Sequence, residues 1–336
     1  MLLSDLTTLR VGGPAGTLLS PDSPGALVTA VRDAWASGEP WLVLGGGSNV
    51  VIGDDGFEGT VIRVLTRGIS QDGSRLTAQA GEPWDAVVAY AVEQGLAGIE
   101  ALSGIPGSAG AAPIQNIGAY GQEVGDALVA IDFVDAETGE RARLSRADLE
   151  LGYRTSTLKQ HRRGLVVSVE LQLQPSDLSA PLTYDQLAST LGERAPLADV
   201  RSAVLALRAS KGMLLDPADP DSASAGSFFT NPIVGDRFAR SLPADVARWP
   251  VDVDSVENST VKLSAAWLIE HAGISKGFAL PGSRAAISSK HTLALVNTGG
   301  ATAEQVAELA RYVQTRVLTE FGVILQPEPI LVGVSL

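Results

Sequence analysis

SGIPGSAGAAPIQNIGAYG, residues 103–121, is the most informative segment of the chain and is called the central loop below. Its glycines are too frequent for a stable helix, and its branched residues are too few for a strand. Glycine lets backbone N–H groups approach a ligand closely and form anion-binding concavities. No Lys or Arg interrupts the segment, so a phosphate bound here would be held by amides. The alternative is an irregular, packed core loop; disorder is disfavoured because Ile105, Ile114, Ile117 and Tyr120 can be buried.

A second glycine-rich segment follows the predicted strand Trp41–Leu44 and reads Gly45-Gly46-Gly47-Ser48-Asn49; it is called the first loop. It is not the dinucleotide fingerprint, because Val50 occupies the third glycine position, and no Lys-Ser/Thr pair follows as in a P-loop. A plain tight turn is the alternative. Two such loops suggest one extended ligand with a central pyrophosphate, either a flavin or a nicotinamide dinucleotide. The missing fingerprint favours a flavin on another fold.

Composition limits the possible functions. The 336 residues suggest two or three domains, and 45% hydrophobic with 19% charged residues is typical of soluble globular proteins. There is no Cys, and the three His residues are not at metal-ligand spacing, so we expect no disulfide and no metal site. A net charge of −13 argues against nucleic acid or an anionic membrane surface as partner. The N-terminus lacks a signal-peptide core, so a cytoplasmic protein is expected.

Hydrophobic periodicity and the residues that typically start or end helices predict the elements that surround the loops. Ser23-Pro24 predicts a helix start, and Thr302 with Gln305 predicts a capping box. The polar run 216–224 is the best boundary in the second half. Further helices are predicted over 84–96, after 181–184, up to Lys211-Gly212 and over 261–271, and strands over 59–65, 75–81, 141–144, 292–297 and 323–325. Alternation predicts half-buried strands around 129–133 and 167–173.

Three polar residues stand in unusual local settings. Arg154 lies in LGYRTSTLK between an aromatic residue and two hydroxyls, Ser227 precedes two phenylalanines in AGSFFTNP, and Glu328 lies between two prolines. For each the ordinary alternative is a surface residue in a turn, with Ser227 acting as a cap. No Gly-x-Ser-x-Gly elbow is present, so Ser227 is not an acyl-transfer nucleophile.

Seven motifs, taken in order, resemble the UDP-N-acetylenolpyruvoylglucosamine reductase (MurB) family of flavoenzymes in peptidoglycan synthesis. They are TTLRVGGPA, LGGGSNVV, SGIPGSAGAAPIQNIGAYGQEV, LGYRTSTLK, AGSFFTNP, KLSAAWLIEHAG and the terminal PEP, and the likeness runs from Thr7 to Gly333. Any one of them is weak. Chance matches would not preserve both their order and their roles, so the set is specific.

The resemblance implies an α+β, three-domain flavoenzyme with a vanillyl-alcohol-oxidase (PCMH)-type FAD-binding fold and a C-terminal substrate-binding α/β domain. It implies an N-terminal FAD-binding subdomain over 1–66, a central one over 67–210 plus 320–336, and a substrate-binding domain over 211–319. Tyr184, in LTYDQL, is similar to the substrate-closing tyrosine of the type I branch. A monomer is expected.

The implied reaction is the NADPH-dependent reduction of UDP-N-acetylglucosamine enolpyruvate to UDP-N-acetylmuramate through non-covalent FAD. This step belongs to peptidoglycan precursor synthesis and so to cell-wall biogenesis, cell shape and cell division. Hydride would pass from flavin N5 to the enolpyruvyl methylene carbon. By the resemblance, Arg154 and Glu328 polarise the substrate carboxylate, Glu328 in a protonated form with a raised pKa, and Ser227 donates the proton.

The resemblance also assigns binding residues. For FAD they are Gly45, Gly46, Gly47, Ser48, Asn49, Ser103, Gly104, Ile105, Pro106, Gly107, Ser108, Asn116, Gly118, Ala119 and Tyr120, with Arg10 as a further candidate. For the substrate they are Tyr153, Tyr184, Lys211 and Asn231. The chain departs from the family pattern at KGMLLDP, which is longer between Lys and Asp-Pro, and at Glu328-Pro329, where Glu-Val is more usual.

Two other functions fit parts of the sequence. A flavin oxidase of the same broad fold would attach FAD covalently through His or Cys, but the chain has no Cys and neither loop contains His. A non-catalytic nucleotide-sugar-binding protein would need the loops but not Ser227. Substitution of Ser227 separates this possibility from the reductase.

Overall fold

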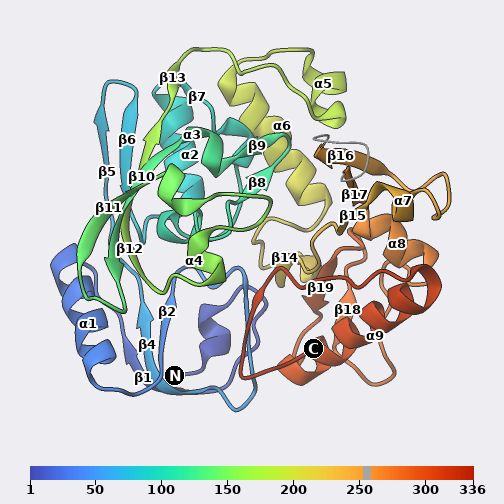
Figure 1. Ribbon diagram of the computed structural model, residues 1–336, viewed down its shortest axis with the longest axis horizontal. Helices are drawn as coiled ribbons and strands as arrows, with labels where there is room; N and C mark the ends of the chain where they lie inside the picture. Colours follow the sequence, from blue (N-terminus) through green and yellow to red (C-terminus); the bar gives the residue numbers. More distant parts are fainter. Residues whose placement is uncertain (253–258) are drawn as a thin grey trace. The chain divides into compact units, whose positions relative to one another are not determined.

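The computed structural model in Figure 1 describes residues 1–252 and 259–336. The chain divides into two compact units, and it passes between them at 1/2, 13/14, 48/49, 56/57 and 214/215. The first unit holds residues 14–48 and 57–214, and the second holds residues 2–13, 49–56 and 215–336. Within the described residues, no helix combines the length and the apolarity needed to cross a bilayer. The three-domain ranges given above stay a prediction.

The first unit contains a five-stranded antiparallel sheet in the order β11–β10–β12–β6–β5. Its strands are β5 (Ile69–Asp72), β6 (Arg75–Gln79), β10 (Leu128–Asp135), β11 (Arg141–Ser145) and β12 (Gly164–Gln172). The predicted strand around 129–133 is β10, where buried Ile131 and Phe133 alternate with the partly exposed Asp132, but the strand is covered on both faces at its end. Phe133 packs in the cluster that contains α2 (Trp84–Glu93), whereas Val134 packs in the cluster that contains α1 (Pro24–Ala36).

A smaller parallel sheet in the order β1–β4–β2 carries the first loop. Its strands are β1 (Ala15–Leu19), β2 (Trp41–Leu44) and β4 (Phe57–Arg63). The predicted start of α1 is confirmed, because Ser23 Oγ accepts a hydrogen bond from Ala26 N and Pro24 is the first helical residue. Since β2 ends at Leu44, the sheet delivers the first loop at the carboxyl end of a strand.

The remaining elements of the first unit lie before, within or after the central loop. They are β7 (Leu96–Ala97), β8 (Gly118–Ala119), β9 (Gln122–Glu123), α3 (Val124–Ala127), α4 (Thr157–Gln160), β13 (Gln174–Pro175), α5 (Asp185–Leu191) and α6 (Leu197–Ser210). Helix α6 packs with α5 through buried Val200, Val204 and Leu187.

The second unit is built around the long helix α9 (Ala303–Phe321), seen in red in Figure 1. Its elements are β3 (Val50–Ile52), β14 (Ser224–Ser227), β15 (Ile233–Gly235), α7 (Asp236–Ala239), β16 (Arg248–Asp252), β17 (Thr260–Leu263), α8 (Ala265–His271), β18 (Ala285–Ile287), β19 (Ala294–Asn297), α9 and β20 (Ile330–Val332). The strands form sheets β14–β19–β18 and β15–β17–β16 and a parallel pair β20–β3.

The predicted capping box of α9 is confirmed. Thr302 Oγ1 accepts from Gln305 N at 3.1 Å, and the Gln305 side chain bonds back to Thr302 N. The Asp54 carboxylate also accepts from the N–H groups of Ala303 (2.7 Å) and Glu304 (3.0 Å). Three N–H groups at the helix start that have no partner within the helix are therefore satisfied, which fixes residues 49–56 against α9.

Two sequence predictions in this unit are wrong. Residues 261–263 belong to β17, and α8 starts only after Ser264, whose Oγ accepts from Trp267 N at 3.2 Å. The last strand is β20 and not 323–325. Val323 and Leu325 alternate because they are buried in the core beside α9, and the Leu325 carbonyl accepts from Gln314 Nε2. Alternation here reflects burial without a strand ladder.

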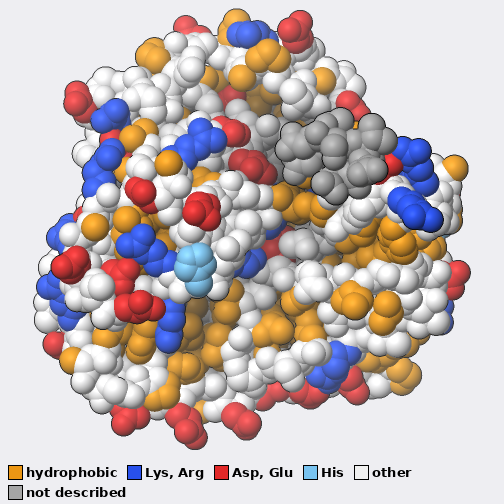
Figure 2. All heavy atoms as spheres, viewed as in Figure 1, with side chains coloured by type: hydrophobic (Ala, Val, Ile, Leu, Met, Phe, Trp, Pro, Cys, Tyr) orange, Lys and Arg blue, Asp and Glu red, His pale blue; other side chains and the backbone are white. Residues whose placement is uncertain are grey.

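On the face shown in Figure 2, Lys and Arg side chains are interspersed with Asp and Glu side chains. The five-stranded sheet of the first unit carries ion pairs, such as Arg143 with Glu170 at 2.7 Å. Exposed pairs of this kind contribute little to stability.

Candidate active site

The first loop and the central loop lie directly against each other. Ser48 Oγ donates to the Pro106 carbonyl at 2.9 Å. A Cβ placed on Gly46 would lie 2.7 Å from the Cα of Gly107, so the two backbones touch at a distance that only glycine permits. The two segments that the sequence singled out separately therefore form one structure.

The meeting point presents amide groups without acceptors. Within residues 1–252 and 259–336, six N–H groups near the point where the two loops meet donate no hydrogen bond to the protein: those of Gly46, Gly47, Ser48, Ile105, Gly107 and Ser108. Gly47 and Ser108 are buried, and buried N–H groups without a partner are rare in folded proteins. Donors grouped in this way form a site for an anion such as a phosphate.

Neighbouring elements anchor the central loop on its other side. Trp84 N donates to the Gly107 carbonyl at 3.1 Å, and the Trp84 indole N–H donates to the Leu102 carbonyl at 3.2 Å. Ser103 is fully buried, and its hydroxyl donates to the Glu100 carbonyl. The Ser103 side chain therefore stabilises the loop and is not directed to a ligand.

Two arginines and an aspartate, which the sequence analysis did not single out, support Gly104. Asp85 Oδ1 accepts from Gly104 N at 2.6 Å, and Arg201 pairs with both carboxylate oxygens of Asp85 at 2.6 and 2.8 Å. Arg208 Nε donates to the Gly104 carbonyl at 3.0 Å. Burial alone would raise the pKa of Asp85, but the hydrogen bonds from Arg201 and Gly104 hold it below its ordinary value. The seven-residue spacing of Arg201 and Arg208 on one helix face was the available signal.

The end of the central loop is a tight hairpin in a left-handed conformation. Strands β8 and β9 are joined by Tyr120 and Gly121, both with positive φ (51° and 89°), the pattern of a type I′ turn. Asn116 also has a positive φ of 50°. Left-handed conformations are uncommon for residues other than glycine and concentrate at functional sites.

Arg154 lies at the tip of a two-residue turn between Gly152 and Thr155 and has a positive φ of 54°. Its guanidinium donates to the carbonyls of Asn116 (3.3 Å) and Gly118, and its side chain is only 17% exposed. Its Cζ lies 5.2 Å from the centre of the Tyr153 ring. The surface-arginine alternative is therefore wrong, because the side chain turns back onto the central loop.

Asn116 and Glu123 brace this turn. Asn116 is 3% exposed, and its side chain donates to Glu123 Oε2 (2.8 Å) and the Gly152 carbonyl (3.0 Å) while accepting from Gly125 N. Glu123 Oε1 lies 3.5 Å from Arg154 Nη1. The predicted cofactor residue Asn116 thus connects the central loop to the Arg154 turn through its side chain.

Tyr120, Tyr184 and Lys211 form a second group in the first unit. The two tyrosine rings meet edge to face with centres 5.1 Å apart, and Lys211 Nζ lies 5.6 and 5.8 Å from the centres of the two rings. Lys211 Nζ also lies 3.5 Å from the Tyr184 hydroxyl. Burial raises the pKa of Tyr120 above its ordinary value. Two predicted substrate residues therefore contact a residue of the predicted cofactor loop.

The second unit brings Ser227 and Glu328 close in space. Ser227 ends β14, and the next residue, Phe228, accepts a hydrogen bond at its carbonyl from Glu328 N at 2.8 Å. Thr230 N donates to the Gln326 carbonyl at 3.0 Å, so the segments run antiparallel. Phe228 and Phe229 are each 1% exposed and fix this pairing in the core. Both predicted catalytic side chains are half-buried.

Two predicted binding asparagines also lie in the second unit. Asn49 Nδ2 donates to the Glu328 carbonyl at 3.3 Å, and the Asn49 carbonyl accepts from Ile330 N. Asn231 Oδ1 accepts from Ala265 N at 3.0 Å, so this side chain caps the start of α8. Arg10 has a positive φ of 57°, and its carbonyl accepts from Asn297.

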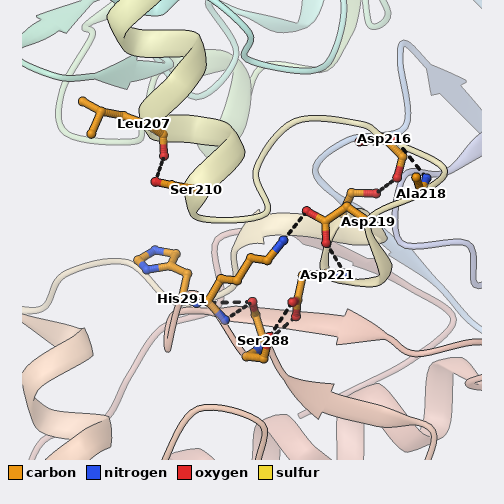
Figure 3. Close-up of polar contacts among 11 residues, drawn as sticks. Leu207, Ser210, Asp216, Ala218, Asp219, Asp221, Ser288 and His291 are labelled. Carbon is orange, nitrogen blue, oxygen red and sulfur yellow. Dashed lines mark hydrogen bonds and ion pairs between the residues drawn. The ribbon is translucent and has the colours of Figure 1, made fainter.

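The predicted polar linker, residues 216–224, is held by hydrogen bonds and an ion pair, as Figure 3 shows. Asp219 pairs with Lys290 Nζ at 2.7 Å, and Asp221 accepts from Ser289 N and Oγ at 2.9 and 2.7 Å. Burial alone would raise the pKa of Asp221, but the hydrogen bonds from Ser289 hold it below its ordinary value. The segment is an ordered arm fixed to the turn before β19.

The predicted site thus falls into two constellations. The first unit gathers Arg154, Tyr153, Tyr184 and Lys211 around the two loops, and the second gathers Ser227, Glu328 and Asn49. In the part of the chain that the structure describes, no group of three His, Asp or Glu side chains could hold a metal ion.

Comparison with known proteins gives a consistent set of relatives. Residues 15–145 match the profile described as an FAD binding domain, and residues 217–332 match the C-terminal domain of UDP-N-acetylenolpyruvoylglucosamine reductase. The reductase of that name from Leifsonia xyli is 56% identical and covers 99% of this chain and 98% of its own. The one from Saccharopolyspora erythraea is 49% identical over 99% of this chain and 95% of its own.

A solved structure agrees with the sequence relatives. The crystal structure of UDP-N-acetylenolpyruvylglucosamine reductase (MurB) from Thermus caldophilus has a TM-score of 0.69 and 29% identity, with 99% of this chain and 97% of that chain covered. The expected fold class, a mixed helix-and-strand flavoenzyme with a PCMH-type FAD-binding domain and a reductase C-terminal domain, is confirmed.

Proposed function

The chain belongs to the UDP-N-acetylenolpyruvoylglucosamine reductase family of FAD-dependent oxidoreductases, and from that premise we propose that it reduces UDP-N-acetylglucosamine enolpyruvate to UDP-N-acetylmuramate with NADPH. The observation that carries the proposal is the group of six unpaired amides where the two glycine loops meet. Amides without acceptors suit the pyrophosphate of a non-covalent dinucleotide such as FAD.

The chemistry divides between cofactor and protein. FAD would be held by the two loops and, when bound, would supply the chemistry of hydride transfer from NADPH to the enolpyruvyl methylene carbon. The protein must then stabilise negative charge that develops on the neighbouring carbon and its carboxylate. Preorganised donors aimed at such charge are usually the largest contribution to catalysis.

Arg154 would provide the cation. Its planar guanidinium matches a carboxylate, and two carbonyls of the central loop together with Glu123 fix its position before substrate arrives. Its left-handed φ of 54° means that the turn holds this side chain in place at a cost in backbone strain.

Ser227 and Glu328 would complete the site from the second unit. Ser227 would donate the proton to the carbon next to the methylene, and Glu328, protonated and with a raised pKa, would hydrogen-bond the substrate carboxylate. Their positions are supported by the short pairing between residues 228–230 and 326–328. The approach of Arg154 to this pair over one ligand is part of the proposal.

The remaining predicted residues would bind the nucleotide part of the substrate. Tyr184 and Lys211 already contact each other, and Lys211 suits a diphosphate as a compact charge. Tyr153 and Asn231 are proposed as further contacts. NADPH and nucleotide sugars are cytoplasmic compounds, so we place this enzyme of peptidoglycan precursor synthesis in the cytoplasm and expect it to influence cell shape and division. We also propose that it is a monomer.

Stopped-flow measurement of the two half-reactions tests the proposal. The purified chain should show flavin absorbance that NADPH bleaches and the enolpyruvyl substrate restores. In S227A the bleaching should keep its rate, and the restoration should slow by about 10²–10⁴-fold, the usual contribution of a positioned proton donor. S241A removes an exposed hydroxyl that bonds only its own turn and serves as the matched control.

Other outcomes would refute parts of this assignment. A colourless protein that binds no added FAD would contradict the flavin site. Restoration at an unchanged rate in S227A would remove Ser227 as the proton donor. Flavin that stays with the denatured protein would point instead to a covalent flavin oxidase.

A further inference from the structure

Arg208 is a buried cation that the proposed function does not yet explain. It is 7% exposed, and among the residues that the structure describes it forms no ion pair with a carboxylate. Burying a guanidinium costs several kcal/mol unless its donors are well used, and an apolar residue of similar size is often neutral or better for stability. We therefore expect this buried guanidinium to have a role besides packing in the core.

The donors of Arg208 reach the backbone of the central loop. Nε donates to the Gly104 carbonyl at 3.0 Å, and Nη2 donates to the Met213 carbonyl at 2.9 Å. The guanidinium also interacts with the Tyr120 hydroxyl, near the far end of the same loop. One side chain on α6 therefore binds the loop near its start, at Gly104, and interacts electrostatically with Tyr120 near its end.

The Gly104 peptide is held from its amide side as well. Gly104 N donates to Asp85 at 2.6 Å, and Asp85 is in turn fixed by Arg201, seven residues before Arg208 on the same face of α6. Gly104 has φ +70°, and a Cβ there would lie 2.6 Å from Leu214 Cδ2. Only glycine can adopt this conformation in so little space, and the peptide is hydrogen-bonded on both its amide and its carbonyl side.

We propose that Arg208 is a positioning residue for the cofactor: it holds the Gly104 carbonyl so that the unpaired amides of Ile105, Gly107 and Ser108 stay aimed at the FAD pyrophosphate. This inference rests on the proposed flavin function. The backbone is held at Leu102, Gly104 and Gly107, before and within this row of amides. Of these three contacts, the one at Gly104 is made by a cationic side chain, Arg208.

FAD titration of the full-length protein, followed by flavin fluorescence, tests the proposal. R208M should weaken FAD affinity by about 10–100-fold, because a charged hydrogen bond contributes about 1.5–3 kcal/mol and tenfold corresponds to 1.4 kcal/mol. R208K should recover part of this loss, because an ammonium keeps the charge and can reach one of the two carbonyls. R143M, which removes an exposed guanidinium of the same unit, is the matched control and should bind FAD normally.

The unfolding midpoint of the FAD-free variants separates positioning from general stability. If R208M unfolds, R208K alone should still fold and should bind FAD more weakly than R143M does. If the unchanged protein binds FAD and R208M binds it within twofold of the same affinity, the inference is overturned and the proposed function is left intact. Failure of the unchanged protein to bind FAD would instead refute the proposed function.

Discussion

At the scale of single residues, contact between the two loops depends on Gly46. G46A places a methyl carbon 2.7 Å from the Cα of Gly107, and neither backbone can yield without separating the loops. We expect FAD affinity to fall at least about tenfold, the equivalent of one lost hydrogen bond to a charged group, when measured by fluorescence titration.

The matched control for this prediction is G25A. A Cβ on Gly25 meets nothing within 4 Å, and the residue lies in α1, so Ala should raise stability by up to about 1 kcal/mol without affecting FAD. Equal FAD affinity in G46A and G25A would show that loop contact does not govern cofactor binding.

Individual candidate site residues could be proposed from motif order but not from local chemistry. Arg154, Ser227 and Glu328 each had an ordinary surface alternative, and only the ordered motif set favoured function. What the sequence could not reveal is backbone conformation: the positive φ of Asn116, Tyr120 and Arg154 depends on contacts with distant residues such as Glu123 and Gly152. Arg208 was missed because its hydrogen-bond partners are backbone carbonyls, and its seven-residue spacing from Arg201 was the one available sequence signal.

At the scale of elements, the start of α9 depends on a cap from outside the helix. D54A removes the carboxylate that accepts from the first two helical N–H groups, so we expect a loss of about 1 kcal/mol in the free energy of unfolding, measured with urea. D55A removes the neighbouring exposed carboxylate and should stay within about 0.5 kcal/mol of the unchanged protein. Similar losses in both variants would contradict the cap.

The contact between α6 and α2 should weaken in acid. The pKa of Asp85 is lowered in the folded state, so its contribution to stability is present above the unfolded pKa, about 3.9, and is lost as the pH falls through the folded value. Because this carboxylate is 40% exposed, D85N should cost only about 1 kcal/mol at pH 7.

Urea unfolding of both proteins at a series of pH values checks this expectation. The stability difference between the unchanged protein and D85N should shrink as the pH is lowered from about 4 toward 2. A difference that stays constant over that range would mean that Asp85 is not the titrating group.

Elements with local signals were predicted best. The α1 start and the α9 capping box depend on neighbouring residues, so the sequence was sufficient. The failures have a common cause: burial from distant segments imitates local periodicity. Residues 261–263 read as the start of a helix because their apolar pattern continues into α8, yet pairing with β15 and β16 makes them a strand.

At the scale of the whole molecule, the proposed catalytic residues come from both compact units, and under the proposed function one substrate would contact residues of each. The chain contains no Cys, which allows two spin labels at introduced cysteines. With D33C on α1 and E308C on α9, both exposed, we expect FAD plus substrate to narrow the distance distribution measured by double electron–electron resonance.

A pair within the first unit, D33C with S202C, is the control and should give the same distances with and without ligand. An unchanged distribution for the first pair on saturation would argue against a ligand held by both units. Arg154 would then have to act without Ser227 and Glu328.

The unpaired amides also have a practical consequence for handling the apoprotein. Inorganic phosphate or sulfate in a buffer can occupy the same donors, and occupancy at a hundredfold excess over its Kd stabilises a protein by about 2.7 kcal/mol. Melting temperatures taken in phosphate would then overstate the intrinsic stability of the empty protein, and cofactor titrations there would report a competition. Buffers free of oxyanions are the appropriate reference for this chain.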